Sequence, residues 1–385
     1  MRILTLIHEY PPIGGGGGKV AQDLARALVK RGHQVRVIAP SHRDLEQDDP
    51  ADGVRVVRIS SFRMRQFAAD LLAMSGYLVV GLAVGLWNIL TWRPHLMHVH
   101  FAVPAGGLTW ILSKLTGVPY VLTAHLGDVP GGVPEKTDAW FRWVYPFTHR
   151  IWRDAAQVTA ISEHTRRLAL AHYPVDIQVI PNGIELGEDF SETLEAVNHP
   201  PQIVFAGRFV PQKNPIQLVN ILARAADLPW QAVMIGDGAL MEATCQEIER
   251  LGLGERVTLT GWVPPAQVHA HFAQSDILLM PSLSEGIPMV GLQALVSGQA
   301  IVASRVGGLL DLVEQGQNGF LHEPSDVDGF VASLRSLLMD DGALLRARNA
   351  SLKIAHRFDL VHIVDRYENM FAKAAHLNVK LEKNS

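Results

Sequence analysis

The sequence is poor in cysteine and in charge. It has one cysteine, Cys245, among 385 residues, and charged residues make up 19% against 48% for hydrophobic ones. A single cysteine excludes an internal disulfide and fits a reducing compartment. No set of cysteine and histidine residues has the spacing of a zinc site, so no metal is expected. The start of the sequence lacks the charged, apolar and small-residue segments of a secretory signal, which predicts a cytoplasmic location.

Long hydrophobic runs are also scarce, with one exception. The stretch from Leu71 to Trp92 carries no formal charge and is about long enough to cross a bilayer. Serine, glycine and asparagine residues interrupt it, and it ends at Arg93-Pro94, just before a run typical of a buried strand. We interpret it as a buried or membrane-facing helix rather than a membrane span.

Short apolar, β-branched runs alternate with longer helical patterns. The first series of expected strands covers residues 2–7, 34–39, 53–59, 95–100, 120–124, 157–161 and 176–180. A polar, acidic stretch follows at 183–201, and the pattern restarts at 202–206, 231–235, 257–260, 277–280, 300–303 and 319–321. Such alternation is typical of parallel sheets built from βαβ units. The sequence therefore predicts an α/β protein with two doubly wound, Rossmann-like domains.

Domain boundaries follow from this pattern. We expect an N-terminal domain at 1–182, a linker at 183–201, a C-terminal domain at 202–357 and a last helix at 358–377 that crosses back to the first domain. With 385 residues the chain is long enough for two hydrophobic cores. Open parallel sheets bind ligands beyond the carboxyl ends of their strands. A central cleft faced by both domains is therefore the expected active site.

Five consecutive glycines, at 14–18, stand between the first expected strand and the first expected helix, in the segment EYPPIGGGGGKV. The loop has no side chains where backbone must approach a ligand, and the helix after it offers free N–H groups to a phosphate. Neither a Walker loop nor the spaced dinucleotide-binding pattern is matched. A flexible surface turn is the alternative interpretation.

Two cations follow the strand expected at 202–206, in the segment GRFVPQKNP, which carries Arg208 and Lys213. Cations at the carboxyl end of a strand can neutralise a diphosphate leaving group without a metal. Arginine does so through a bidentate fork, and lysine acts as a point charge. A solvated basic pair is the alternative.

The segment PSLSEGIPMVGLQALVSG carries Glu285 just before a helix expected to start at Pro288. Backbone N–H groups from Gly286 to Val290 would point at an anion, and Glu285 could accept hydrogen bonds from sugar hydroxyls. A favourable interaction of Glu285 with the helix dipole is the alternative. Further along, Asp326-Val327-Asp328 has the form of a metal-binding DxD motif, but its place before a helical run favours helix capping.

Taken in order, nine segments resemble a retaining family 4 glycosyltransferase of the GT-B fold, also called glycosyl transferase group 1. They are GGGGG, RGHQV, HVHFAVPAG, LTAHLGDV, VIPNGIE, GRFVPQKNP, IGDG, SEGIP and GGLLDLVEQGQNGFL, and they span nearly the whole chain. The resemblance implies a nucleotide-diphospho-sugar donor, retention of configuration and no metal or other cofactor. It also implies a hexosyltransferase-like role in cell-envelope polysaccharide or glycolipid synthesis, with no nucleic acid as a partner.

The resemblance also implies roles for individual residues. His125 would lie by the reacting sugar, Glu285 would bind its hydroxyls, and the two cations would hold the diphosphate. The implied catalytic residues are His125, Glu285, Arg208 and Lys213. The implied donor-binding residues are Gly15, Gly16, Arg208, Lys213, Gly286, Ile287, Met289, Val290 and Gln293. The candidates on the acceptor side are His100 and Asp128; His98 and His100 are interpreted as structural or cleft-lining.

One position departs from the family pattern, which has a second glutamate eight residues after the first, on the nucleotide ribose. This sequence has Gln293 there. An amide can still hydrogen-bond a ribose hydroxyl, but only as a neutral group. We expect an altered donor affinity. A non-catalytic nucleotide-sugar-binding protein, or a GT-B epimerase or phosphorylase, are the alternative functions.

Charge is distributed unevenly along the chain. Met1 to Asn182 holds 19 basic and 14 acidic residues, a balance of +5, and the remainder holds 15 and 24, a balance of −9. Four arginines, Arg55, Arg58, Arg63 and Arg65, precede the apolar stretch that starts at Leu71. We expect a saccharide or lipid-linked acceptor, and peripheral attachment of the N-terminal half to the anionic inner face of the cell membrane. Chance placement of surface charge is the alternative.

Overall fold

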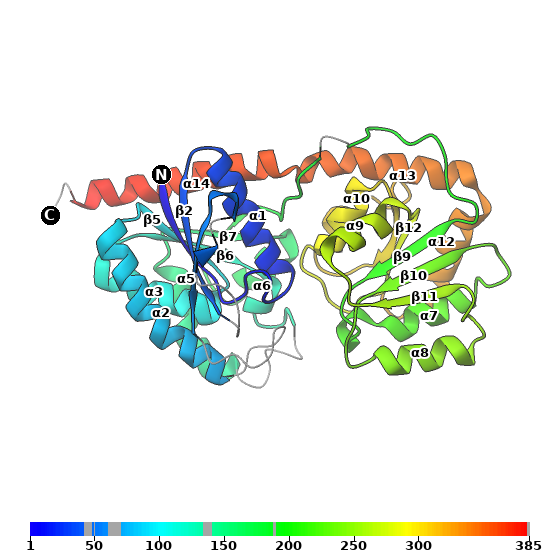
Figure 1. Ribbon diagram of the computed structural model, residues 1–385, viewed down its shortest axis with the longest axis horizontal. Helices are drawn as coiled ribbons and strands as arrows, with labels where there is room; N and C mark the ends of the chain where they lie inside the picture. The colour runs from blue at the N-terminus through cyan, green and yellow to red at the C-terminus, as the bar shows by residue number, and fades with distance from the viewer. Residues whose placement is uncertain (42–47, 50, 61–70, 134–140, 188–189, 383–385) are drawn as a thin grey trace. The chain divides into compact units, whose positions relative to one another are not determined.

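The computed structural model describes residues 1–41, 48–49, 51–60, 71–133, 141–187 and 190–382. The chain divides into two compact units (Figure 1). Unit 1 comprises Met1–Gly183 together with Leu360–Ser385, and unit 2 comprises Ile184–Asp359. Each unit is a parallel sheet with helices on both faces, which is the layered α/β architecture that the alternating pattern predicts.

The sheet of unit 1 has the order β3-β4-β2-β1-β5-β6-β7-β8 among the described residues. All neighbouring strands are parallel except β3, which runs antiparallel to β4. The strands are β1 (Arg2–Leu6), β2 (Gln34–Pro40), β3 (Asp48–Asp49), β4 (Arg55–Ile59), β5 (Leu96–His100), β6 (Tyr120–Ala124), β7 (Gln157–Ala160) and β8 (Gln178–Val179). The central strands are buried on both faces, which explains why they read as nearly continuous apolar runs.

Two helical layers cover this sheet. Ile3 of β1 packs with α1 (Gly16–Lys30) and α14 (Leu360–Glu382), whereas Leu4 packs on the opposite face. Successive strand residues point to opposite faces, so one strand supplies both cores. The opposite layer contains α2 (Leu71–Trp92), α3 (Gly107–Thr116), α5 (Phe141–Arg153) and α6 (Glu163–Leu170).

Unit 2 has a six-stranded sheet among its described residues, in the order β11-β10-β9-β12-β13-β14, and every pair is parallel. The strands are β9 (Gln202–Ala206), β10 (Gln231–Ile235), β11 (Val257–Gly261), β12 (Ile277–Met280), β13 (Ala300–Ser304) and β14 (Gly319–His322). One core lies under α7 (Pro215–Ala223), α8 (Met241–Arg250) and α12 (Val327–Met339). The other lies under α9 (Pro265–Ala273), α10 (Met289–Val296) and α11 (Leu309–Leu312), and α13 (Asp341–Ala355) contributes to both.

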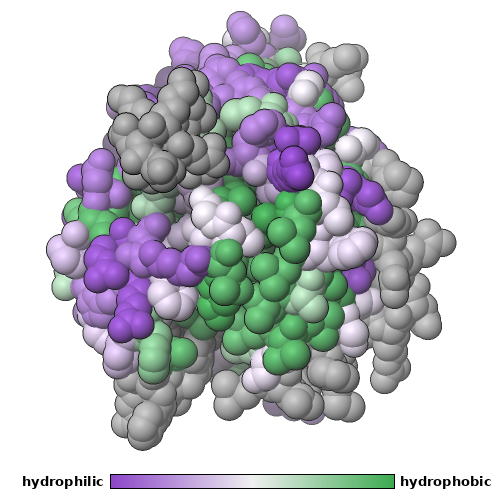
Figure 2. Space-filling view, turned by 90° about the vertical axis from the view of Figure 1, so that its left-hand side faces the viewer, coloured by the Kyte–Doolittle hydropathy of each residue, from purple (hydrophilic) through white to green (hydrophobic). Residues whose placement is uncertain are grey.

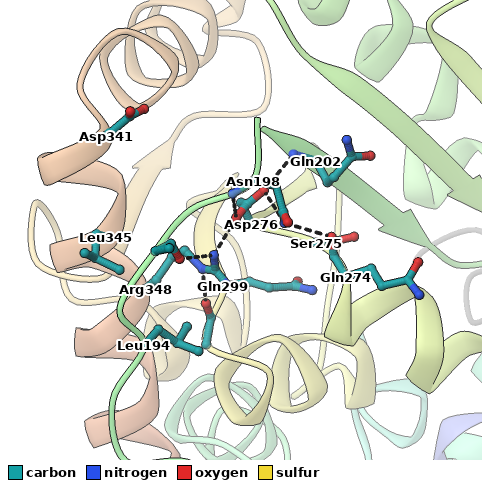
Figure 3. A network of polar contacts seen from close by, with 12 residues as sticks. Leu194, Asn198, Gln202, Gln274, Ser275, Asp276, Gln299, Asp341, Leu345 and Arg348 are labelled. Atoms are coloured by element: carbon teal, nitrogen blue, oxygen red, sulfur yellow. Dashed lines mark hydrogen bonds and ion pairs between the residues drawn. The ribbon is translucent and has the colours of Figure 1, made fainter. Parts of the chain in front are cut away.

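A buried ion pair ties together the amino ends of the strands in unit 2 (Figure 3). Asp276, which precedes β12 and is fully buried, accepts hydrogen bonds from Arg348 at 2.5 Å, from the backbone N–H of Gln202 at 2.7 Å and from the side chain of Asn198 at 2.9 Å. Leu194 is joined to Asn349 of α13 through its backbone. The described residues of the stretch predicted as a linker, 184–187 and 190–201, therefore belong to unit 2.

Because this network lies at the amino ends of the strands, it does not occupy the carboxyl ends, beyond which open parallel sheets bind ligands. A buried charge is tolerated when its hydrogen-bonding capacity is filled, and Asp276 has four donors. The expected strands at 120–124, 202–206, 231–235 and 277–280 are confirmed residue for residue by β6, β9, β10 and β12. The capping interpretation of Asp326 is confirmed as well, since its side chain accepts the backbone N–H of Gly329 at the start of α12.

Candidate active site

In unit 2 the candidate residues follow two neighbouring strands. The loop after β9 carries Arg208 and Lys213, and the loop after β12 carries Glu285. Because β9 and β12 are adjacent and parallel, their carboxyl ends meet at one edge of the sheet. Lys213 Nζ donates a hydrogen bond to Glu285 Oε1 at 2.6 Å, with the two side chains only 14% and 5% exposed.

The two loops are fastened to each other by Gln212. Its side chain donates to the backbone oxygen of Ser284 at 2.8 Å, and its own backbone oxygen accepts the N–H of Leu283 at 2.8 Å. These bonds hold Lys213 beside Glu285. Arg208 is exposed, and no carboxylate in the described part of the chain pairs with it. The structure thus brings Lys213 and Glu285 together, and Arg208 lies five residues before Lys213 in the same loop.

Gly307 lies against the backbone of Glu285. It has φ of +53°, a left-handed conformation that glycine adopts without strain, and a Cβ there would lie 1.7 Å from the backbone oxygen of Glu285. Gly308 donates its N–H to that same oxygen at 3.2 Å. The position of Glu285 therefore depends on the absence of a side chain at 307.

The helix after Glu285 begins at Met289 and is preceded by Pro288 as its N-cap residue. The free N–H groups of its first turn, Met289 and Val290 among them, form the positive end of the helix dipole. Ile287 is buried in the core of unit 2, so its contribution to a ligand is confined to its backbone. Gln293 lies one turn further on, where its side chain Nε2 is 2.5 Å from Nδ1 of His269 on α9.

In unit 1 the glycine loop leads into α1, which begins at Gly16 with Gly15 as its N-cap. The backbone N–H of Gly15 donates to Glu9 Oε2 at 3.2 Å. Gly14 has φ of +93°, and a Cβ there would lie 2.5 Å from Cβ of Glu9. The carboxylate of Glu9 thus accepts a hydrogen bond from the same N–H group, that of Gly15, which is predicted to approach a donor phosphate.

His125 follows β6 and belongs to a column of buried histidines. Its Nε2 lies 3.2 Å from Nδ1 of His100, and His98 is tilted against His100 with ring centroids 4.4 Å apart. His98 is 2.8 Å from Thr123 Oγ1, and this hydroxyl is 3.3 Å from the hydroxyl of Tyr367 on α14. The C-terminal helix of unit 1 therefore closes the column at the end away from His125.

Burial keeps the three histidine rings neutral. It lowers the pKa of His98 to about 3, with a further lowering from nearby His125. Burial and the neighbouring His98 take the pKa of His100 well below its ordinary value. Burial likewise lowers the pKa of His125 to about 4, although the carboxylate of Glu9 acts in the opposite direction. At neutral pH His125 is therefore a neutral hydrogen-bonding ring rather than a cation.

Asp128 supports the loop of His125. Its carboxylate accepts the backbone N–H of His125 at 2.9 Å and that of Ala102 at 2.8 Å, and the residue is only 2% exposed. Burial raises the pKa of Asp128 to about 7, against the lowering effect of those backbone hydrogen bonds. His100, the other candidate on the acceptor side, is fully buried. Asp128 thus contacts the backbone of His125, and His100 contacts its ring.

Sequence reasoning missed Glu9 and Phe101. The ring of Phe101 is stacked on His125 with centroids 4.3 Å apart and meets His8 edge-on at 4.8 Å. Phe101 also has φ of +73°, an unusual backbone conformation for a side chain of this size. A Cβ on Gly17 would lie 2.5 Å from its ring, so it packs against the glycine loop. The segment HFAVPAG carried the signal, but nothing in its spacing distinguishes Phe101 from a core aromatic.

Arg58 does not belong to the basic surface predicted from the sequence. It is buried, and its guanidinium donates to the backbone oxygens of Tyr10, Pro11 and Pro40, just before the glycine loop. Its role is to fix the approach to that loop. Arg63 and Arg65 lie outside the described residues. Among the described residues, no group of three or more His, Cys, Asp or Glu is placed to hold a metal ion.

Comparisons with known proteins cover both units. Residues 15–183 match the family model described as Glycosyl transferase 4-like domain, and residues 188–353 match Glycosyl transferases group 1. The chain is 27% identical to the glycogen synthase of Mycobacterium tuberculosis over 388 residues, which covers 93% of this chain and 91% of that protein. It is 26% identical to the Escherichia coli UDP-Gal:alpha-D-GlcNAc-diphosphoundecaprenol alpha-1,3-galactosyltransferase, covering 75% and 78% of the two chains.

The fold is likewise that of solved glycosyltransferase structures. The crystal structure of Anabaena HepE in complex with UDP-glucose superimposes with a TM-score of 0.73 and 21% identity, covering 97% of this chain and 99% of that one. Two parallel-sheet units of this kind make up the GT-B fold, as the sequence predicts. The chain belongs to the GT-B glycosyltransferases of group 1, enzymes that use a nucleotide-sugar donor.

Proposed function

We propose that this chain transfers a sugar from a nucleoside-diphospho-sugar to a saccharide or lipid-linked acceptor, with retention of configuration and without a metal ion. The observation that carries the proposal is the Lys213–Glu285 pair, at 2.6 Å, at the carboxyl ends of two adjacent strands. A carboxylate suited to sugar hydroxyls and a cation suited to a diphosphate are neighbours there. Exposed Arg208 adds the second cation.

The proposed chemistry needs charge stabilisation at two places. As the bond between sugar and diphosphate breaks, the anomeric carbon gains oxocarbenium character and the diphosphate gains negative charge. Arg208 and Lys213 would stabilise the leaving group, together with the N-terminal end of α10. Glu285 would bind sugar hydroxyls. Its hydrogen bond to Lys213 lowers its nucleophilicity, which favours positioning over a covalent role.

His125 would act as a neutral group near the reacting sugar. With its pKa lowered to about 4 by burial, it is not protonated near neutral pH. We assign it hydrogen bonding and shape, through a ring held between Phe101 and His100. Asp128 would position it through the backbone.

Retention of configuration is tested by NMR of the reaction mixture. With an α-linked donor, the first new anomeric proton signal should show the coupling constant of an α-glycoside. A β-glycoside as the first product would contradict retention. The relatives in complex with UDP-glucose, or named for UDP-galactose, make UDP-hexoses the first donors to test.

The proposed acceptor is presented by a membrane, and the support for this is the outer face of α2 and α3. One helix in the described residues, Met74–Trp92, is long and apolar enough to cross a membrane, and 33% of its most apolar window is buried. Val79, Ala83, Trp87 and Leu90 are exposed on it at a spacing that lines up one stripe, and Trp87 is 69% exposed. Figure 2 shows a contiguous hydrophobic area on the side of unit 1 where α2 and α3 lie in Figure 1.

Helix α3 extends the exposed apolar stripe of α2. Its residues Ile111 and Leu115, four positions apart, are both exposed, and α3 packs along α2. The sequence from Leu71 to Gly127 contains no Asp or Glu and carries Arg93, while Lys114 is paired with Asp154 at 2.9 Å. An apolar stripe without acidic residues suits an anionic lipid surface. We therefore propose that unit 1 rests on an anionic membrane through the α2–α3 face.

A further inference from the structure

The side chain of Gln293 is held by a histidine from the neighbouring helix. Its Nε2 is 2.5 Å from Nδ1 of His269, which lies exposed on α9, while Gln293 is half-buried on α10. The two helices pack against each other. Gln293 stands where the family pattern has a glutamate, so the surroundings of its amide decide what this position offers to a ligand.

An amide, unlike a carboxylate, has two different ends. Its nitrogen can only donate hydrogen bonds, and its oxygen can only accept them. In the observed arrangement Nε2 donates to Nδ1 of His269, so the imidazole carries no proton on that nitrogen. The oxygen Oε1 is the end that His269 does not use. If the amide were reversed, its nitrogen would take the place of Oε1. A ligand hydroxyl that donates a hydrogen bond there would then face another donor instead of an acceptor.

We infer that His269 is a positioning residue that turns the Gln293 amide so that Oε1 accepts hydrogen bonds from the ribose hydroxyls of the donor. The inference rests on the proposed function, because it requires a nucleoside diphosphate at this site. A glutamate would offer an acceptor oxygen in either orientation and would not need such a neighbour. The His269–Gln293 pair therefore restores, with neutral groups, the acceptor that the carboxylate provides.

The test uses two substitutions of opposite hydrogen-bonding character. His269→Asp can only accept and preserves the orientation of the amide, whereas His269→Lys can only donate and reverses it. Titration calorimetry measures binding of UDP, ADP and GDP, of their 2′,3′-dideoxy analogues and of inorganic pyrophosphate. The wild-type chain and His269→Asp should prefer the ribose form by about tenfold or more, as expected for loss of a hydrogen bond to a buried group.

His269→Lys should lose this preference while keeping its affinity for pyrophosphate. The variant that should keep the ribose preference, His269→Asp, is the one that simple charge attraction would disfavour, because a lysine attracts and an aspartate repels an anionic ligand. Ala270→Asp and Ala270→Lys, at the exposed neighbouring position, measure that charge effect alone. They should change the binding of the ribose and dideoxy forms equally.

Each outcome decides between separate claims. A ribose preference that survives in His269→Lys overturns the role of His269. A preference that survives in Gln293→Ala shows that the amide does not contact the ribose, and it overturns the inference while leaving the proposed function intact. A wild-type chain that binds none of the nucleoside diphosphates overturns both. In Gln293→Glu the two His269 substitutions should no longer differ in ribose preference, and a difference equal to that in the parent would also overturn the inference.

Discussion

Lys213 and Glu285 are 72 residues apart in the sequence and form a hydrogen-bonded ion pair at 2.6 Å at the carboxyl ends of β9 and β12. The pair joins the cation expected at the diphosphate to the carboxylate expected at the sugar. A change of either residue removes the partner of the other, so in the proposed mechanism the pair would link sugar binding to leaving-group stabilisation.

Removal of either cation should slow the reaction more than it weakens binding. Arg208→Ala and Lys213→Ala should each lower kcat by about a hundredfold or more, as for other preorganised groups at developing charge. Lys213→Ala should also lower thermal stability, because it leaves the nearly buried Glu285 carboxylate without its partner. Arg335→Ala, which breaks an exposed pair with Asp227, is the control and should change neither quantity. An unchanged kcat in both cation variants would refute their assignment.

A methyl group at position 307 should displace Glu285. Gly307→Ala would place Cβ 1.7 Å from the backbone oxygen of Glu285, so the backbone must move. We expect a loss of kcat comparable to that of a Glu285 variant. Gly316→Ala is the matched control, because Gly316 also has a left-handed φ of +74° but has open space around its Cβ position. It should cost about 1 kcal/mol of stability from the backbone conformation and leave kcat unchanged. Equal kcat in the two variants would contradict the claim.

These contacts show what the sequence could and could not predict. The apolar runs predict the bounds of β9 and β12 to the residue, because strands of a parallel sheet are buried on both faces and appear in the sequence as continuous apolar runs. The loop motifs identified Lys213 and Glu285 but not the bond between them, nor the Gln212 clamp that fastens the loops. Arg58 was misplaced on the surface because its partners are backbone oxygens, which leave no trace in the pattern of side chains.

The buried histidine column should make unit 1 sensitive to acid. His98 and His125 have pKa values lowered to about 3 and about 4, and His100 is lowered as well, so the unfolded chain takes up three protons below pH 6.5 that the folded chain does not. Asp128 opposes this, since its raised pKa of about 7 makes the folded chain hold one proton between pH 7 and 3.8. These four groups give a net uptake of two protons on unfolding, and His95 and His164, whose pKa values burial also lowers, add to it, so stability falls as pH falls.

Denaturant unfolding between pH 8 and 4.5 measures this effect. The free energy of unfolding of unit 1 should fall below pH 6.5, and the column together with Asp128 contributes a slope that approaches about 3 kcal/mol per pH unit. His100→Gln should flatten the dependence, provided that its own transition remains cooperative, and exposed His362→Gln should not alter it. A stability that is constant or increases between pH 6.5 and 4.5 would contradict the neutral column.

The α2–α3 face should bind anionic vesicles mainly through its apolar side chains. Co-sedimentation should decrease by about tenfold or more in the double variant Val79→Ser, Trp87→Ser, since each substitution removes the transfer energy of an exposed apolar group. Trp262→Ser removes a 63% exposed tryptophan from unit 2 and is the control. High salt should weaken binding only moderately, because Arg58 is buried and Lys114 is paired with Asp154. Equal binding of the double variant and the control would rule out this face.

Acceptor-dependent release of nucleoside diphosphate tests the central claim most directly. A panel of nucleotide-hexoses, with UDP-hexoses first, is incubated with saccharide and lipid-extract acceptors, once with excess chelator and once with magnesium or manganese. We predict that one donor releases its nucleoside diphosphate only when acceptor is added, at the same rate in both conditions, and that Glu285→Gln abolishes the release. Release that requires the added metal would contradict the metal-independent mechanism. Release without acceptor, or from no donor under either condition, would contradict sugar transfer itself.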